Sequence, residues 1–219
     1  MSLFRAGAPL AAFVLLVGCS SNDEGSGEKL VKAASLCEGN LSAKARGAIE
    51  LIAGTKEFLP IDSSSAKRAA EDLVDDYLLG SLNKDRDACR IHKPGTNEIA
   101  EITMQFSLDD GQFLSSSGDG PSFKGYDIGR KALASPKKAV LYIECSSAKL
   151  SDTSATLLRG ELLNRESPAG DAEDLRRANL TVLHSVALAL SKELGCTGNA
   201  GLSTKPPRFE LHGRYSPKR

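Results

Sequence analysis

Cys19 is the residue whose surroundings point most directly to a chemical reaction. Arg5 gives a positive start to the chain, and an apolar run extends from Ala6 to Val17, so residues 1–18 have the form of a signal peptide. At about 1.5 Å of rise per residue, this run is too short to cross a hydrocarbon core about 30 Å thick. It ends in Leu16–Cys19 (LVGC), a branched apolar residue followed by small residues and a thiol, which resembles a lipobox. The pattern predicts cleavage before Cys19 and a thioether-linked diacylglycerol on its sulfur.

The segment after this cysteine is suited to act as a tether. Residues 19–28 are polar and rich in Gly and Ser, so they cannot bury apolar surface and are expected to be flexible. Two or three acyl chains on Cys19 would make membrane anchoring effectively permanent. Two alternatives stay open, an ordinary secretory signal with a chance cysteine and a short signal anchor.

The other four cysteines, Cys37, Cys89, Cys145 and Cys196, are an even number in a chain that carries an export signal. None of them has the CxxC spacing of a redox pair or zinc site, so two structural disulfides are the expected outcome. Four cysteines allow three pairings. We favour Cys37–Cys89 with Cys145–Cys196, which closes two loops of nearly equal length.

Other reactive residues are scattered along the chain. The sequence has no GxSxG, HExxH, Walker or post-strand GxGxxG motif, so we expect no catalytic residue, metal or cofactor. Asp109, Asp110 and Asp119 lack the ligand spacing of an EF-hand, and we interpret them as a turn and a polar loop. His184 is interpreted as a half-buried helix residue, and Glu144 as a solvent-facing strand residue. Four further acidic residues are interpreted as the solvated face of one helix: Glu71, Asp72, Asp75 and Asp76.

Three helices are predicted, each beginning after a capping Ser or Asp. They cover residues 43–53, 66–79 and 172–194. The expected buried side of the second helix contains Ala69, Leu73 and Tyr77. The last helix carries a continuous leucine and valine stripe and ends before a glycine.

Strands are predicted between the helices, where apolar and polar residues alternate. They cover residues 89–93, 99–108, 123–134, 139–146 and 155–164, of which the last could also be a short helix. Asp109–Gly111 is predicted to be a hairpin-type turn. This order predicts an α+β fold: an antiparallel sheet of about four to five strands, with N-terminal helices and a long C-terminal helix packed on it, and two disulfides. We expect a single domain over 29–201 and an extended tail over 202–219.

The charge balance limits the partners that this chain could bind. Lys+Arg and Asp+Glu both number 28, which gives no electrostatic basis for binding nucleic acid. Aromatic residues make up 5% of the chain, with no Trp, so stacking on bases or sugars is also disfavoured. The expected partners are the membrane, through lipid on Cys19, and an envelope protein or small ligand.

Three segments carry a resemblance to known sequences. They are residues 37–42 (CEGNLS) before a helix that ends at 52–54, Cys89 at the start of a strand, and residues 179–196 (NLTVLHSVALALSKELGC). In these segments the chain resembles small secreted lipoproteins of actinobacteria, like those of streptomycetes, whose function is unknown. The resemblance does not extend to residues 97–170. It implies a cell-surface α+β domain without catalytic activity and assigns no catalytic residue.

These observations predict a membrane-anchored extracytoplasmic lipoprotein that acts as a non-catalytic binding or accessory module of the cell envelope. The alternative is an envelope hydrolase with an unrecognised active site. A pocket that gathered Asp109, Asp119 or His92 around a strand end would favour that alternative.

Overall fold

The described part of the chain is built around a six-stranded antiparallel sheet. The structure is a computed structural model, and it describes residues 29–60, 64–95, 101–115, 122–207 and 209. The strands are β1 Arg86–Ile91, β2 Ile102–Leu108, β3 Lys124–Tyr126, β4 Lys131–Ala134, β5 Lys138–Ser147 and β6 Ser151–Asn164. Their order across the sheet is β1-β2-β6-β5-β4-β3, and every neighbouring pair is antiparallel.

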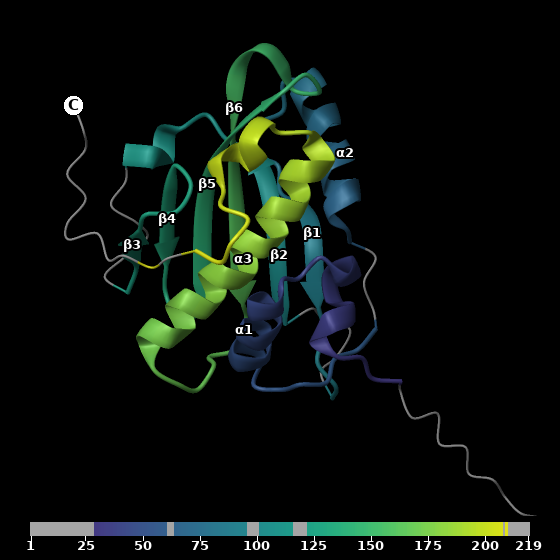
Figure 1. Cartoon of the computed structure of the whole chain (residues 1–219), viewed down its shortest axis with the longest axis vertical. Helices are drawn as coiled ribbons and strands as arrows, with labels where there is room; N and C mark the ends of the chain where they lie inside the picture. Colours follow the sequence, from purple (N-terminus) through teal and green to yellow (C-terminus); the bar gives the residue numbers. More distant parts are fainter. Residues whose placement is uncertain (1–28, 61–63, 96–100, 116–121, 208, 210–219) are drawn as a thin grey trace, which may run out of the picture.

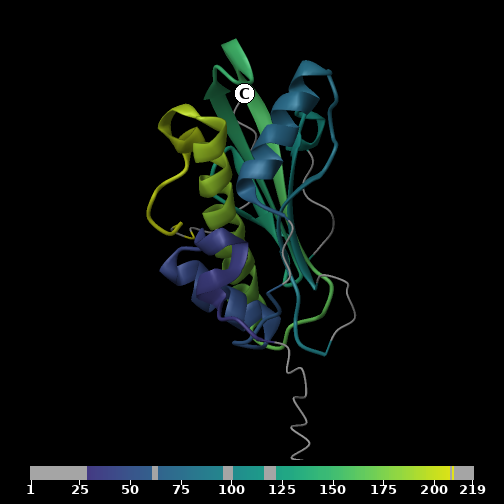
Figure 2. The ribbon, with the colours of Figure 1, turned by 90° about the vertical axis from the view of Figure 1, so that its right-hand side faces the viewer.

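The helices pack on this sheet. They are α1 Ala43–Ala53, α2 Ala66–Leu78 and α3 Ala172–Leu194, with short 3-10 turns η1 Ala33–Gly39, η2 Gln112–Ser115 and η3 Thr197–Gly201. The long helix α3 crosses the sheet diagonally, with α1 beside its lower half and α2 along the β1 edge (Figure 1). Turned by 90°, α1 and α3 form one layer beside the sheet (Figure 2). The predicted α+β class is therefore confirmed, with six strands instead of four to five.

The helix boundaries follow from caps that the sequence supplies. The side chain of Ser42 accepts a hydrogen bond from an N–H of the first turn of α1, and that of Asp171 accepts two from α3. The residues that follow α1 and α3, Gly54 and Gly195, both adopt the left-handed conformation that ends a helix readily. The predicted bounds of both helices are confirmed.

The two middle strands of the sheet, β6 and β5, contribute many of the buried core residues. Residues 155–164 are a strand, as favoured over the helix alternative, and they belong to β6, which pairs with β2 on one side and β5 on the other. Gly160 of β6 lies directly under the ring of the buried Phe106. A Cβ at this position would lie 2.5 Å from Cε1 of that ring, so a glycine is required for the two strands to pack as they do.

One predicted strand, residues 123–134, is in fact a hairpin of β3 and β4. The turn, residues 127–130, contains Gly129, which has φ +61°, and a Cβ there would lie 2.6 Å from the carbonyl oxygen of Tyr142. The prediction was wrong because it passed over a turn signal, Asp127 and Gly129, within an otherwise strand-like segment. Its glycine is needed both for the left-handed backbone and for the close approach to β5, and local sequence does not reveal the second requirement.

The predicted hairpin turn at Asp109–Gly111 is also wrong. β2 pairs with β1 and β6, and after Gly111 the chain enters η2 instead of returning along β2. The carboxylate of Asp109 accepts the N–H of Gly111 at 2.7 Å, and that of Asp110 accepts the N–H of Gln112 at 3.0 Å. These two side-chain bonds turn the backbone out of the sheet.

Candidate functional site

The four cysteines beyond the tether are joined as Cys37–Cys89 and Cys145–Cys196, with Cα–Cα distances of 5.2 and 5.0 Å. The favoured pairing is confirmed. The first bond joins η1 to β1, and the second joins β5 to the residue two positions beyond α3. Such bonds form and persist outside the cytoplasm, so they indicate an extracytoplasmic protein.

The fifth cysteine, Cys19, lies outside the described residues, as do the predicted signal peptide and tether. Within the described residues, no helix is both long enough and apolar enough to cross a membrane.

The residues that the hydrolase alternative would use are not gathered. His92 follows β1 and Asp109 follows β2, and because these strands are antiparallel, the two residues lie at opposite ends of β2. Asp119 lies outside the described residues. Glu144 is exposed, as predicted, and pairs with Arg130. In the described ranges no group of three or more His, Cys, Asp and Glu residues is placed to hold a metal ion.

His184 lies inside the helical layer. Its side chain is 3% exposed, so it is fully buried and not half-buried as expected. Burial lowers the pKa of His184 to about 4, because an imidazolium there would lose its hydration. The folded protein therefore holds a neutral histidine in α3 at neutral pH.

The acidic residues of α2 divide into two groups. Asp76 was predicted to be solvated, but it is buried, with 2% of its surface exposed. Tyr77 was predicted to be buried, but it is 37% exposed. Both oxygens of Asp76 accept hydrogen bonds from the guanidinium of Arg86, each at 2.6 Å. These bonds lower the pKa of Asp76 despite its burial, and they join α2 to β1. Glu71 and Asp75 are exposed, as predicted.

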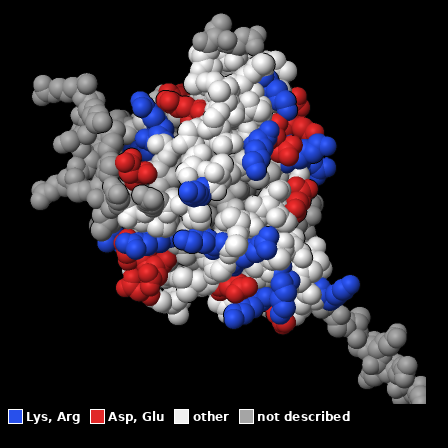
Figure 3. Space-filling view, in the orientation of Figure 1, with Lys and Arg blue, Asp and Glu red and all other residues white. Residues whose placement is uncertain are grey.

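A groove of about 300 Å³ runs along the exposed side of α2. Ala70 and Val74 give it an apolar floor, and its sides carry charged residues from three parts of the chain. They are Lys67, Glu71 and Asp75 from α2, Lys149 from the turn between β5 and β6, and Glu193 from the end of α3. Acidic and basic side chains lie next to one another over α2, at the upper right of Figure 3.

Both walls of the groove are held in place. The hydroxyl of Ser147 donates to the carbonyl of Leu194 at 2.5 Å, and the ammonium of Lys149 donates to the carbonyl of Glu193 at 2.6 Å. These bonds satisfy carbonyls that the last turn of α3 leaves unpaired, and the Cys145–Cys196 disulfide closes the same corner. The opposite wall, α2, is fixed by its ion pair with Arg86. The groove is therefore preformed.

Exposed leucines continue from the groove around the end of α2. Leu78 is 74% exposed, Leu79 is 77% exposed and Leu82 is 51% exposed. Leu78 lies four residues after Val74, so it extends the same stripe of the helix that forms the groove floor. Single exposed leucines are common on protein surfaces, but here three lie within five residues of one another at one helix end.

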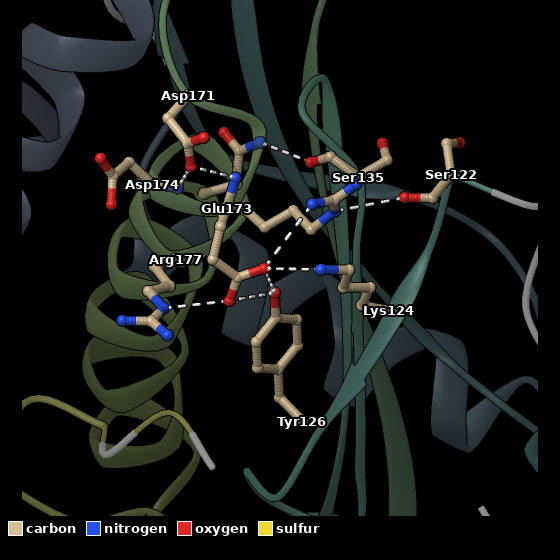
Figure 4. Close-up of polar contacts among 10 residues, drawn as sticks. Ser122, Lys124, Tyr126, Ser135, Asp171, Glu173, Asp174 and Arg177 are labelled. Carbon is tan, nitrogen blue, oxygen red and sulfur yellow. Dashed lines mark hydrogen bonds and ion pairs between the residues drawn. The ribbon is translucent and has the colours of Figure 1, made fainter. Parts of the chain in front are cut away.

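A second polar cluster lies where the edge strand β3 meets the first turn of α3 (Figure 4). The carboxylate of Glu173 accepts hydrogen bonds from the hydroxyl of Tyr126 at 3.1 Å, the ammonium of Lys124 at 3.2 Å and the guanidinium of Arg177 at 3.0 Å. Burial would raise the pKa of Glu173, but these donors lower it overall. Burial and the nearby carboxylate both raise the pKa of Tyr126. The cluster fastens β3 to α3.

The start of the C-terminal tail packs against the folded core. Leu202 is 4% exposed. The ring of Phe209 meets that of Tyr126 edge-on, with centroids 5.8 Å apart, and the guanidinium of Arg177 lies 5.9 Å from the Phe209 centroid. The Glu173 cluster is thus a joint between β3, α3 and the tail.

The groove was missed by sequence reasoning, although its α2 residues had been singled out. Glu71 and Asp75 were assigned to the solvated face, and nothing local places Lys149 and Glu193 beside them. The one available signal was Ala70, Val74 and Leu78, an apolar stripe at spacings of four on the acidic side of the helix.

Comparison with known proteins finds no matching family model, no matching curated protein and no matching solved structure. The resemblance to actinobacterial lipoproteins stays a prediction.

Proposed function

We propose that this chain is a lipid-anchored extracytoplasmic protein that acts as a non-catalytic binding or accessory module of the cell envelope. The observation that carries the proposal is the disulfide pairing. Four of the five cysteines are joined to one another, which leaves Cys19 as the one thiol outside both bonds. That cysteine is also the one preceded by an apolar run and the lipobox-like LVGC. Lipid attachment at Cys19 would therefore not compete with disulfide formation, which uses the other four cysteines.

The binding role is supported by the form of the α2 groove. Both of its walls are held by a disulfide, by hydrogen bonds to helix carbonyls or by a buried ion pair, so a ligand would not have to order them. Preformed surfaces bind with a smaller entropic cost than mobile ones. The exposed leucines beside the groove add apolar surface that association would bury.

The anchoring part is tested by replacing the lipid-bearing residue in the native host. For the wild-type chain we expect incorporation of radioactive palmitate and recovery in the membrane fraction. Cys19→Ser should abolish both and release the protein to the soluble extracytoplasmic or culture fraction. A matched control is Ser20→Ala, which should leave labelling and fractionation unchanged. A Cys19→Ser protein that still sediments with membranes would refute the lipid anchor.

A further inference from the structure

The groove along α2 combines an apolar floor with three acidic side chains, which outnumber the two lysines of its lining, Lys67 and Lys149. Glu71, Asp75 and Glu193 make no ion pair within the described residues. The ammonium of Lys149 already donates a hydrogen bond to the backbone carbonyl of Glu193 at 2.6 Å. A ligand that brings positive charge beside an apolar face would satisfy both features of this groove.

The dimensions of the floor fit a short helix. Ala70, Val74 and Leu78 succeed one another at intervals of four, so they span about 12 Å along α2 at about 1.5 Å per residue. That is the length over which a second helix presents apolar residues at i, i+4 and i+7. Leu78, at the open end of the stripe, is 74% exposed and would be the principal apolar contact.

Two other occupants fit the charges less well. A membrane surface that carries anionic lipids would be repelled by the excess of carboxylates in the groove. A second copy joined by a two-fold axis would set the same patch against itself, so the excess of acidic residues in the groove would meet an equal excess on the other copy.

The position of the groove also favours a separate partner. In Figure 1 the N-terminal end of the described chain leaves at the lower right, whereas α2 occupies the upper right. Residues 19–28, the predicted tether, can extend at most about 3.6 Å each. Within the domain, the end of α2 lies away from the point where the predicted tether joins it.

We propose that the groove between α2 and the end of α3 binds a basic, amphipathic helix of another envelope protein. This inference rests on the proposed function, because it names the partner class of a lipid-anchored binding module. The apolar side of the partner helix packs on Val74 and Leu78. Its Lys or Arg residues pair with Glu71, Asp75 and Glu193.

The test is site-specific photocrosslinking in the native host with the full-length, lipid-modified protein. A benzoylphenylalanine is placed at Leu78, and in a matched control at Leu163, a 39% exposed residue of β6. Crosslinked products are digested and the joined peptides are sequenced by mass spectrometry. We expect position 78, but not position 163, to join a segment with basic residues and apolar residues at helical spacing.

The charge requirement is tested in the same experiment. Glu71→Lys with Asp75→Lys should reduce the crosslinked product about tenfold or more, because like charges would then oppose the partner. Glu38→Lys with Glu50→Lys makes the same change in net charge outside the groove and should leave the yield unchanged. Thermal unfolding of each purified variant establishes that it folds.

Several outcomes would overturn the inference. They are crosslinks to lipid, crosslinks to a second copy, joined segments without basic residues, an equal loss in both charge-reversal pairs, and no product from a folded protein. Membrane fractionation of the same cells separates the two proposals. A protein that is anchored through Cys19 but gives any of these results refutes the groove inference alone, whereas an unanchored protein refutes the proposed function.

Discussion

The buried ion pair between Asp76 and Arg86 gives the most quantitative prediction. Arg86→Met keeps a side chain of similar reach but leaves a carboxylate that is 2% exposed without its guanidinium. Breaking a buried pair from one side costs about 3–5 kcal/mol. Lys84, whose ammonium lies 3.7 Å from the same carboxylate, will offset part of that loss, so we expect about 3 kcal/mol. For a protein of this size each kcal/mol corresponds to roughly 2–4 °C, so Tm should fall by about 6–12 °C.

The pH dependence of this loss tests its cause. The pKa of Asp76 is lowered below its usual 3.8 in the folded protein, so the pair stabilises the fold above that pH and its contribution is lost as the pH falls through the lowered pKa. The Tm difference between wild type and Arg86→Met, measured by circular dichroism, should therefore be full at pH 7 and shrink below about pH 4.

A double variant separates charge burial from packing. Asp76→Leu combined with Arg86→Met removes both charges, so it should regain most of the stability that Arg86→Met loses. A Tm change of less than about 2 °C for Arg86→Met at pH 7 would contradict the reasoning, as would an equal change at pH 3.

Three other predictions concern the core and the disulfides. Gly160→Ala should cost about 1–3 kcal/mol in urea unfolding, because its Cβ would overlap the ring of Phe106, and Phe106→Leu in the same chain should recover part of the loss. Replacing Cys145 and Cys196 together by Ser should cost up to about 4 kcal/mol, measured in the same way, because a loop of 51 positions is no longer closed in the unfolded chain. The pKa of His184 is about 4 in the folded protein and near 6.5 in the unfolded chain, so the folded protein binds this proton only at lower pH. Stability should thus decline between pH 6.5 and 4, by about 3 kcal/mol at most, and His184→Gln should flatten that decline.

Each of these predictions has a clear contrary result. A Gly160→Ala protein as stable as wild type would mean that the strands do not pack as described. An unchanged unfolding curve for the Cys145 and Cys196 double variant would contradict the assigned bond. An NMR titration that places the His184 pKa near 6.5 would remove the basis of the pH prediction.

Local sequence was sufficient for the features that local chemistry determines. Ser42, Asp171, Gly54 and Gly195 mark helix ends because their own side chains or backbone angles satisfy the terminal groups. Alternating apolar residues located β2 and β6. These signals depend on a few neighbouring positions and are therefore readable in one chain. The even number of cysteines predicted two disulfides but left three pairings open, of which the favoured one is confirmed.

The features that sequence reasoning missed depend on distant residues. Asp76 is buried only because Arg86, beyond the end of α2, supplies a matching cation. The β3–β4 hairpin packs closely on β5 because Gly129 has no Cβ that would meet the carbonyl oxygen of Tyr142. The groove exists because the last turn of α3 is fastened beside α2 by Ser147 and a disulfide. Periodicity within one segment contains no information about such contacts.

The measurement that tests the central claim most directly is the mass of the N-terminal peptide of the mature protein, extracted from membranes and digested without reduction. The account predicts a peptide that begins at Cys19 and carries the mass of a diacylglycerol on its sulfur, with Cys37–Cys89 and Cys145–Cys196 recovered as joined peptides. A mature chain that begins elsewhere, or that begins at Cys19 with an unmodified thiol, would contradict it.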